Sequence, residues 1–354
     1  MVVGQGEKVA ATPAAGLRAS LRKLQEDTQD FWAPLSAVAR VDAATLSPLR
    51  FHREFVSRNV PVVLTNAMTS PQWEHALSAW QDDAYLEAKA GDTRVTVDVT
   101  PFGLGDAVLE LPGHHRELFV MPEEREMPLA EFLRVFRDRE GFDGVPYLSH
   151  QVREEKNLAR GAKQFPALFE DVPSCVELAK EAFGNEPDAV NIWIGDERAV
   201  STMHKDHYEQ EFASARYRHA ASPVHHGDEH NVIDRVATTR FHERYPEHAA
   251  WSILSSPDKG DTPWIPVDPL HIDVERFPLA SALKPIEVVV NAGEMLYLPA
   301  MWYHRATQLC PTISVNYWHD MDFDCRYVYF NFVHDVAAAI TVQEEDEEGE
   351  DHNR

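Results

Sequence analysis

The stretch Ser201-Thr-Met-His204-Lys-Asp206-His-Tyr208 carries a histidine and an aspartate two residues apart. Alternate side chains of a strand lie on one face, so His204 and Asp206 can point at one ion while Lys205 points away. A distant stretch, Gly293-Glu-Met-Leu-Tyr-Leu-Pro-Ala-Met-Trp-Tyr-His304, offers a second histidine. Two imidazoles and one carboxylate on one face of an octahedron leave three positions open, which suits a non-haem Fe(II) that activates oxygen.

The surrounding sequence selects these residues from 18 histidines, because the His-x-Asp spacing recurs at His226/Asp228 and His271/Asp273. An apolar, β-branched and aromatic run at 189–194 precedes His204 and predicts a buried strand, whereas His226 lies in a polar, histidine-rich stretch. His304 also lies between predicted strands. These are at 288–290, 295–298 and 312–318.

These segments resemble those of the JmjC-domain 2-oxoglutarate oxygenases, and especially a JmjC-only subfamily of bifunctional peptidases and (3S)-lysyl hydroxylases. Residues 190–195, 263–269 and 315–322 match as well, and the similarity extends from about residue 17 to about residue 336. The resemblance implies an α+β protein whose barrel is a double-stranded β-helix, the cupin-like jelly roll. It also implies Fe(II), O2 and the cosubstrate 2-oxoglutarate, with His204, Asp206 and His304 as metal ligands.

We expect four regions along the chain. These are a flexible N-terminus at 1–14, helices and strands packing on the barrel at 15–150, the JmjC domain at 151–340 and an acidic disordered tail at 341–354. The sequence Thr12-Pro13 can start a helix. Further predicted elements are strands at 59–64 and 93–99 and a helix with apolar Leu129, Phe132, Leu133 and Phe136 on one face.

The resemblance assigns four further residues to 2-oxoglutarate binding. Ser201 and Tyr147 match positions that reach the far carboxylate, whereas Gln210 and Asn316 match polar positions near the keto acid. The family more often has asparagine where Gln210 stands. Three of these residues also have a structural interpretation. Ser201 and Asn316 can form hydrogen bonds with backbone groups at strand ends, and Tyr147 can be part of the core.

One departure concerns the basic residue that holds the far carboxylate. The family has a lysine about fifteen positions after the first histidine, and His219 stands there in this chain, with no lysine between Asp206 and Lys259. Arg216 or Arg218 could hold the far carboxylate through two parallel hydrogen bonds if its side chain pointed into the barrel.

Residues 211–250 as a whole diverge from the family. The stretch 211–223 has little strand pattern, so we expect a barrel that is incomplete here, with open sheet edges. Apolar residues within 232–245, including Val236 and Phe241, could instead pack as a helix. A divergent insertion, an alternative exon or a faulty gene model would each give such a segment. A second metal site at His225, His226, Asp228 and His230 is less favoured than a solvated loop.

Charge and composition restrict the partners. The 33 basic and 58 acidic residues give a net charge of −25, which argues against nucleic-acid binding and suits a basic partner. Cysteines 175, 310 and 325 suggest no disulfide framework, and no apolar run is long enough for a membrane span. We expect a cytoplasmic or nucleocytoplasmic protein, and a homodimer formed through the apolar segment 326–336.

The resemblance implies C3 hydroxylation of a lysine in a developmentally regulated GTP-binding protein, with release of succinate and carbon dioxide. It also implies peptidase activity on methylated histone tails, although the sequence shows no Ser, Cys or zinc protease motif. Two alternatives stay open. One is a pseudoenzyme or binding module that cannot hold 2-oxoglutarate, and the other is a redox-inactive cupin with Zn(II) or Mn(II).

Overall fold

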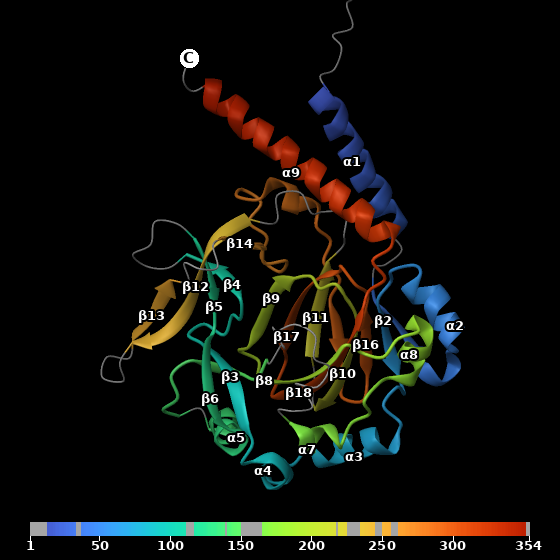
Figure 1. Cartoon of the computed structure of the whole chain (residues 1–354), viewed down its shortest axis with the longest axis vertical. Coiled ribbons are helices and arrows are strands. Elements are labelled where there is room, and N and C mark those ends of the chain that lie inside the picture. Colours follow the sequence, from blue (N-terminus) through green and yellow to red (C-terminus); the bar gives the residue numbers. More distant parts are fainter. Residues whose placement is uncertain are drawn as a thin grey trace, which may run out of the picture.

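The structure is a computed structural model. It describes residues 13–32, 37–110, 117–138, 140–149, 165–216, 219–224, 234–244, 250–255 and 261–351. Two sheets face each other at the centre, helices pack along one side and one end of them, and two long helices project from the opposite end (Figure 1). No described helix has the length and apolar composition required to cross a membrane.

The described helices cluster in the N-terminal half, apart from the long C-terminal one. They are α1 (Pro13–Trp32), α2 (Pro48–Phe51), α3 (Pro71–Ala79), α4 (Asp83–Ala90), α5 (Leu129–Arg137), α7 (Pro166–Phe169), α8 (Glu177–Phe183) and α9 (Cys325–Asp351), with short turns at Ala43–Thr45, His52–Val56 and Pro278–Ala282. Ser47 and Ser70 cap α2 and α3, each through a side-chain oxygen that accepts a backbone N–H, and a proline follows each cap. The predicted helices at 13 and 129 are confirmed.

The described strands form four sheets. The strands are β1 (Ala39–Asp42), β2 (Val62–Thr65), β3 (Arg94–Thr100), β4 (Ala107–Leu109), β5 (Leu118–Met121), β6 (Glu123–Pro128), β7 (Val145–Tyr147), β8 (Ala189–Gly195), β9 (Val200–His204), β10 (Tyr208–Arg216), β11 (His219–Val224), β12 (Asp234–Arg244), β13 (Ala250–Ser255), β14 (Asp261–Trp264), β15 (Val288–Val290), β16 (Met295–Leu298), β17 (Tyr303–Gln308) and β18 (Thr312–Asp320). The barrel consists of a six-stranded sheet, β1-β2-β16-β10-β18-β8, and a four-stranded sheet, β15-β11-β17-β9.

The divergent segment contributes inner strands to both barrel sheets. β10 lies between β16 and β18, with Gln210 opposite Trp318, and β11 lies between β15 and β17, with His219 opposite Gln308. This corrects the expectation that residues 211–223 would leave the barrel without these strands. The backbones of β10 and β11 pair with a neighbouring strand on each side, although their sequence lacks a regular alternation of apolar and polar residues.

The strands β12, β13 and β14 belong to a separate sheet beside the barrel, together with β4 and β5. β12 pairs with β5 in parallel and with β13 and β14 in antiparallel fashion, so Val236 and Phe241 belong to a strand. The alternative of a helix there is therefore wrong, because sheet partners from distant parts of the chain override the local pattern. The candidate second metal site at 225–230, together with Arg218, falls outside the described residues.

The main hydrophobic core covers the outer face of the six-stranded sheet. Phe51 of α2, Phe183 of α8 and Tyr297 of β16 meet there, with ring centroids 5.0 Å apart for Phe51 and Tyr297. All four apolar residues predicted for the helix at 129 are buried in the same core. This packing fixes the sheet whose opposite face looks into the barrel.

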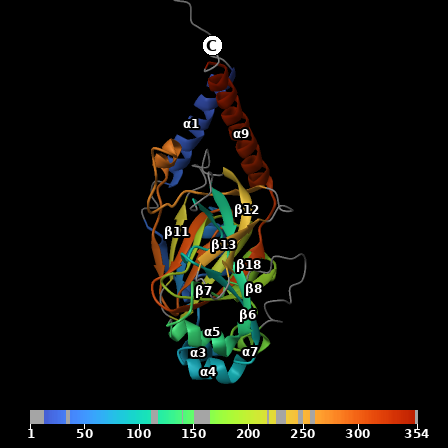
Figure 2. The same ribbon diagram turned by 90° about the vertical axis from the view of Figure 1, so that its left-hand side faces the viewer.

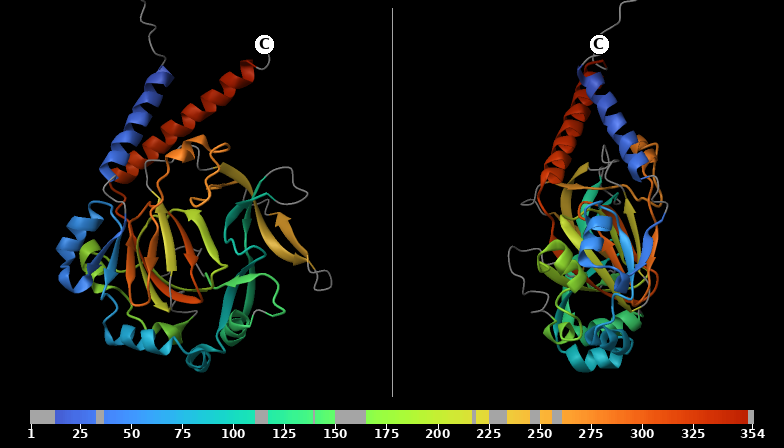
Figure 3. Two further views of the ribbon diagram at one scale, coloured as in Figure 1. Left: turned by 180° about the vertical axis from the view of Figure 1, so that it is seen from behind. Right: turned by 90° about the vertical axis from the view of Figure 1, so that its right-hand side faces the viewer.

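Helices α1 and α9 both project from the same end of the barrel (Figures 2 and 3). The backbone of α9 is helical as far as Asp351, so it includes most of the acidic tail at 341–354 that was expected to be disordered. Glutamate has a high helix propensity, and the apolar first half of the segment starts the helix that the acidic residues continue.

Candidate metal centre

His204, Asp206 and His304 converge between the two barrel sheets. His204 ends β9, Asp206 follows two residues later, and His304 lies on β17 directly opposite His204 in the strand pairing. Their potential ligand atoms all lie within 4.8 Å of one another. Nε2 of each histidine is 3.7 Å from Oδ2 of Asp206. Nitrogen and carboxylate atoms at such separations can share one divalent ion.

Backbone carbonyls orient both imidazoles. Nδ1 of His204 is 2.7 Å from the carbonyl oxygen of Thr202, and Nδ1 of His304 is 3.0 Å from that of Trp302. A carbonyl can only accept a hydrogen bond, so each Nδ1 carries a proton, and in the neutral ring Nε2 is the nitrogen that can bind a metal. The rings are therefore held in the tautomer that binds metal.

Asp206 is fixed by a chain of side-chain hydrogen bonds. Nε2 of Gln210 donates to Oδ2 of Asp206 over 2.8 Å, and Nε1 of Trp318 donates to Oε1 of Gln210 over 3.1 Å. The indole can only donate, which sets the orientation of the amide. Gln210, predicted to lie near the keto acid, lines the pocket but uses its amide to support the metal ligand.

The competing His-x-Asp pair at 271 and 273 does not form a comparable site. The His271 side chain is 84% exposed and lies 3.4 Å from Asp268. Among the residues that the structure describes, only the set of His204, Asp206 and His304 has the geometry of a metal site.

A pocket adjoins the three ligands. Its walls come from β8, β9, β10, β17 and β18, with Tyr147 of β7 at one side. The lining residues are Tyr147, Trp193, Ser201, His204, Asp206, Gln210, Phe212, His304, Ala306, Ser314 and Trp318. No lysine or arginine occurs among these described lining residues.

Tyr147 and Ser201 form a hydroxyl pair in this pocket. Ser201 hydrogen-bonds the Tyr147 phenol, and burial raises the pKa of Tyr147 to about 12, so the phenol stays protonated at neutral pH. Nε2 of Gln308 donates to the same phenolic oxygen over 3.1 Å. The amide NH2 of Gln308 can only donate, so it takes up neither hydroxyl proton: one lies in the hydrogen bond between Tyr147 and Ser201, and the other can be donated to a ligand.

The backbone of β8 determines the position of Tyr147. Leu148 and Ile194 exchange two backbone hydrogen bonds of 2.9 Å, which places Tyr147 beside Trp193. A Cβ on Gly195 would lie only 2.7 Å from the Tyr147 ring, so the glycine makes room for it.

Asn316 lies behind the pocket wall. Its Oδ1 accepts a 2.8 Å hydrogen bond from Nε1 of Trp193. Its Nδ2 is buried without a hydrogen-bond partner among the described residues, as are both polar side-chain atoms of Asn191 on the paired strand. Asn316 is thus near the site but does not line the pocket itself.

The structure adds three residues that the sequence did not single out. Gln308 and Gly195 act on Tyr147, as described above. The Trp264 ring lies parallel to that of His204, with centroids 6.3 Å apart, and its Nε1 donates to the Thr202 hydroxyl over 3.2 Å. Only the strand register places these residues at the site, which explains why no local motif reveals them.

The donor set fits a divalent iron and, in most respects, a dicarboxylic keto acid. Two imidazole Nε2 atoms and one carboxylate match the three protein ligands of a non-haem Fe(II) site. The pocket beside them provides hydroxyl donors for a carboxylate. The position where the family has lysine is occupied by His219, whose backbone lies opposite Gln308.

Comparison with known proteins agrees with this geometry. The sequence model of the cupin-like domain family matches residues 48–325. The bifunctional peptidase and (3S)-lysyl hydroxylase of Homo sapiens is 34% identical over 94% of this chain and 99% of its own length. The chain belongs to the JmjC family of cupin-like proteins.

Two further JmjC relatives match over most of their length. JmjC domain-containing protein E of Dictyostelium discoideum is 31% identical over 89% of this chain and 92% of its own. A lysine-specific demethylase of Arabidopsis thaliana is 34% identical over 81% of this chain and 83% of its own. The chain is therefore an enzyme of the JmjC 2-oxoglutarate-dependent oxygenase class.

Proposed function

We propose that the protein is an Fe(II)- and 2-oxoglutarate-dependent hydroxylase of lysine side chains in proteins. The observation that carries the proposal is the convergence of His204, Asp206 and His304, with both imidazoles held in the metal-binding tautomer. When bound, Fe(II) with 2-oxoglutarate and O2 supplies the chemistry that inserts oxygen into a C–H bond. In this reaction His204, Asp206 and His304 hold the metal and do not act as acids or bases.

Tyr147 and Ser201 would hold the far carboxylate of 2-oxoglutarate by hydrogen bonds. Both line the pocket, and Gln308 donates to the Tyr147 oxygen, so the phenolic proton can point at an acceptor in the pocket. Hydrogen bonds to a charged group contribute roughly 1.5–3 kcal/mol each. Neutral donors of this kind can replace part of what a lysine provides elsewhere in the family.

The substrate is proposed to be a lysine in a developmentally regulated GTP-binding protein. The likeness to the human (3S)-lysyl hydroxylase supports a lysine as the substrate residue, and the net charge of −25 favours encounter with a basic segment. That relative is also named a peptidase, and another is named a demethylase, so both activities belong among the outcomes to be measured.

The test uses the full chain with Fe(II), 2-oxoglutarate and lysyl peptides from such a GTP-binding protein. Hydroxylation predicts succinate release that depends on the peptide, together with a gain of one oxygen atom in the peptide mass. Formaldehyde release from methyl-lysine peptides would indicate a demethylase instead. Peptide cleavage would indicate the peptidase activity.

A second candidate function is a binding module that does not turn over 2-oxoglutarate. It is favoured by the lack of lysine or arginine among the described pocket-lining residues. Calorimetric titration of Mn(II)-loaded protein with 2-oxoglutarate separates the two functions. Binding by the native chain supports the hydroxylase, whereas binding only after His219→Lys supports the non-catalytic module.

We also propose that the protein is a homodimer formed through α9 and that it works in the cytoplasm, either there alone or in the nucleus as well. Val328, Tyr329 and Phe332 are each at least 60% exposed on this helix, and Leu17 and Leu24 are exposed on α1. Light scattering should give the mass of a dimer for the native chain and of a monomer for Phe332→Glu. Leu49→Glu, at an exposed leucine on α2, is the matched control and should remain dimeric.

A further inference from the structure

The loop that carries two of the metal ligands has a second face that points away from the metal. His204 and Asp206 face the site, whereas the intervening Lys205 and the following His207 contact aromatic side chains of β17, of α9 and of the turn before it. The loop therefore lies between the metal centre and the start of α9.

Lys205 is held by two aromatic rings. Its Nζ donates to the Tyr303 hydroxyl over 3.1 Å and lies 4.9 Å from the centre of the Tyr303 ring. The same Nζ lies 5.1 Å from the centre of the Phe330 ring. Both distances are within the range of cation–π attraction. Tyr303 directly precedes the ligand His304, so one ammonium group connects the loop, the second ligand strand and α9.

Other contacts hold the loop against the same surface. The backbone N–H of Met301 donates to the Asp206 carbonyl over 2.8 Å, and that of Met321 donates to the His207 carbonyl over 3.2 Å. The His207 ring packs on Phe323 and Tyr327, with centroids 6.4 and 5.8 Å apart. Residues on both sides of Lys205 are thus fixed by the barrel end and by α9.

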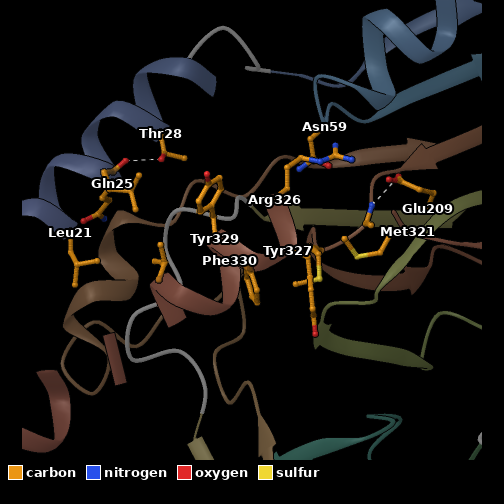
Figure 4. Close-up of a pocket in the computed structure, with 14 residues that line it drawn as sticks. Leu21, Gln25, Thr28, Asn59, Glu209, Met321, Arg326, Tyr327, Tyr329 and Phe330 are labelled. Atoms are coloured by element: carbon orange, nitrogen blue, oxygen red, sulfur yellow. Dashed lines mark hydrogen bonds between the residues drawn. The ribbon is translucent and has the colours of Figure 1, made fainter. Parts of the chain in front are cut away.

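The opposite side of this contact borders a cavity of about 250 Å³ between α1 and α9. Figure 4 shows Tyr327 and Phe330 of α9 on one side of it and Leu21 and Gln25 of α1 on the other. Tyr327 and Phe330 thus pack on the buried residues Ala300, Met301 and Met321 on one side and border the cavity on the other. The positions of Tyr327 and Phe330 therefore depend on how α9 packs against the end of the barrel.

We propose that Lys205 is a positioning residue of the metal site and that α9, through Phe330, is the element against which it fixes the ligand loop. This inference rests on the metal site of the proposed function but does not depend on the hydroxylation reaction. Outer residues that orient metal ligands typically change metal affinity ten- to a hundredfold when they are replaced.

The sign of the effect separates positioning from simple electrostatics. A positive charge near a divalent cation repels it, so removing the ammonium should tighten metal binding if charge alone mattered. If Lys205 fixes the geometry of His204 and Asp206, its removal should weaken binding instead. The two explanations therefore predict opposite shifts for Lys205→Met.

The experiment measures the affinity of the full-length apoprotein for Co(II), together with the visible absorption spectrum of the bound ion. Lys205→Met and Phe330→Leu should each weaken Co(II) binding about tenfold and alter the spectrum. Lys205→Arg keeps the charge and can stack on both rings, so it should stay within about threefold of the native chain. Lys284→Met, at an exposed lysine, should leave the affinity unchanged.

Thermal unfolding of each apoprotein distinguishes misfolding from loss of positioning. If Lys205→Met does not fold, Phe330→Leu decides the matter, because it leaves the loop sequence intact. Unchanged or tighter Co(II) binding by Lys205→Met would overturn the proposal. Unchanged Co(II) binding by Phe330→Leu would show that α9 does not help to position the ligand loop. Failure of the native chain to turn over a lysyl peptide would contradict the proposed reaction but not this inference.

Discussion

Nε2 of Gln210 donates a hydrogen bond to Oδ2 of Asp206, the same oxygen that faces both histidine ligands. The amide is held in turn by Trp318 from β18. The only carboxylate of the metal site is thus oriented by the neighbouring strand of the six-stranded sheet. Its geometry depends on the register between β10 and β18.

Replacing Gln210 with leucine should weaken divalent metal binding about tenfold, because Asp206 loses the donor that fixes its orientation. Titration of the apoprotein with Mn(II), followed by electron paramagnetic resonance, measures the change. Gln81→Leu, which replaces a glutamine remote from the site, is the control. Equal Mn(II) affinities for Gln210→Leu and the native chain would contradict this role.

Replacing Tyr147 with phenylalanine should weaken 2-oxoglutarate binding roughly ten- to a hundredfold, the effect of losing one hydrogen bond to a charged group. Binding of 2-oxobutyrate, which lacks the far carboxylate, should change little. Calorimetry on the Mn(II)-loaded protein gives both affinities. An equal loss for the two keto acids would place the Tyr147 effect at the metal end of the pocket.

Replacing Gly195 with alanine should displace the Tyr147 ring, since the added Cβ would lie 2.7 and 2.8 Å from two of its carbons. Overpacking of this kind costs about 1–3 kcal/mol of unfolding free energy, and 2-oxoglutarate binding should weaken with it. Denaturant unfolding and calorimetry measure the two effects. Gly16→Ala, on α1 where nothing lies within 4 Å of the new Cβ, should not reduce stability.

The buried pair of Glu211 and His319 predicts a pH dependence of stability. Both side chains are fully buried, with Oε2 and Nε2 3.4 Å apart, and burial raises the pKa of Glu211 from 4.5 to about 7. The folded protein thus keeps this proton to higher pH than the unfolded chain. The unfolding free energy should therefore fall as pH rises between about 4.5 and 7, by about 3 kcal/mol in total.

The Glu211→Gln variant should lack this fall, because the amide does not titrate. Urea unfolding at several pH values between 4.5 and 8 measures the difference between the variant and the native chain. The exposed Glu287→Gln should keep the native pH profile. A difference between Glu211→Gln and the native chain that did not vary with pH would contradict the assignment.

The sequence was sufficient to predict that His204, Asp206 and His304 lie together, and it predicted most of the barrel. His204 and His304 each follow a predicted strand. The apolar runs in these strands are strong enough to predict them from the local sequence alone. The helix at 129 was predictable for the same reason, because its apolar residues repeat at helical spacing.

The strands β10 and β11 were not predictable from local pattern. Glu209 and Glu211 face a buried surface, where Glu209 accepts a 2.7 Å hydrogen bond from Tyr297 and Glu211 lies against His319. Buried acidic residues and small alanines hide the usual alternation, so sheet partners remote in sequence decide the structure. The roles of Gln308 and Gly195 likewise depend on register, which no short motif encodes.

The most direct test of the central claim is peptide-dependent succinate release by the full chain, with Fe(II) and 2-oxoglutarate, compared with that of His204→Ala. If His204, Asp206 and His304 form the iron site, the native chain should release succinate when a substrate lysyl peptide is added, and the variant should lose this activity. Equal succinate release by both proteins would contradict the account.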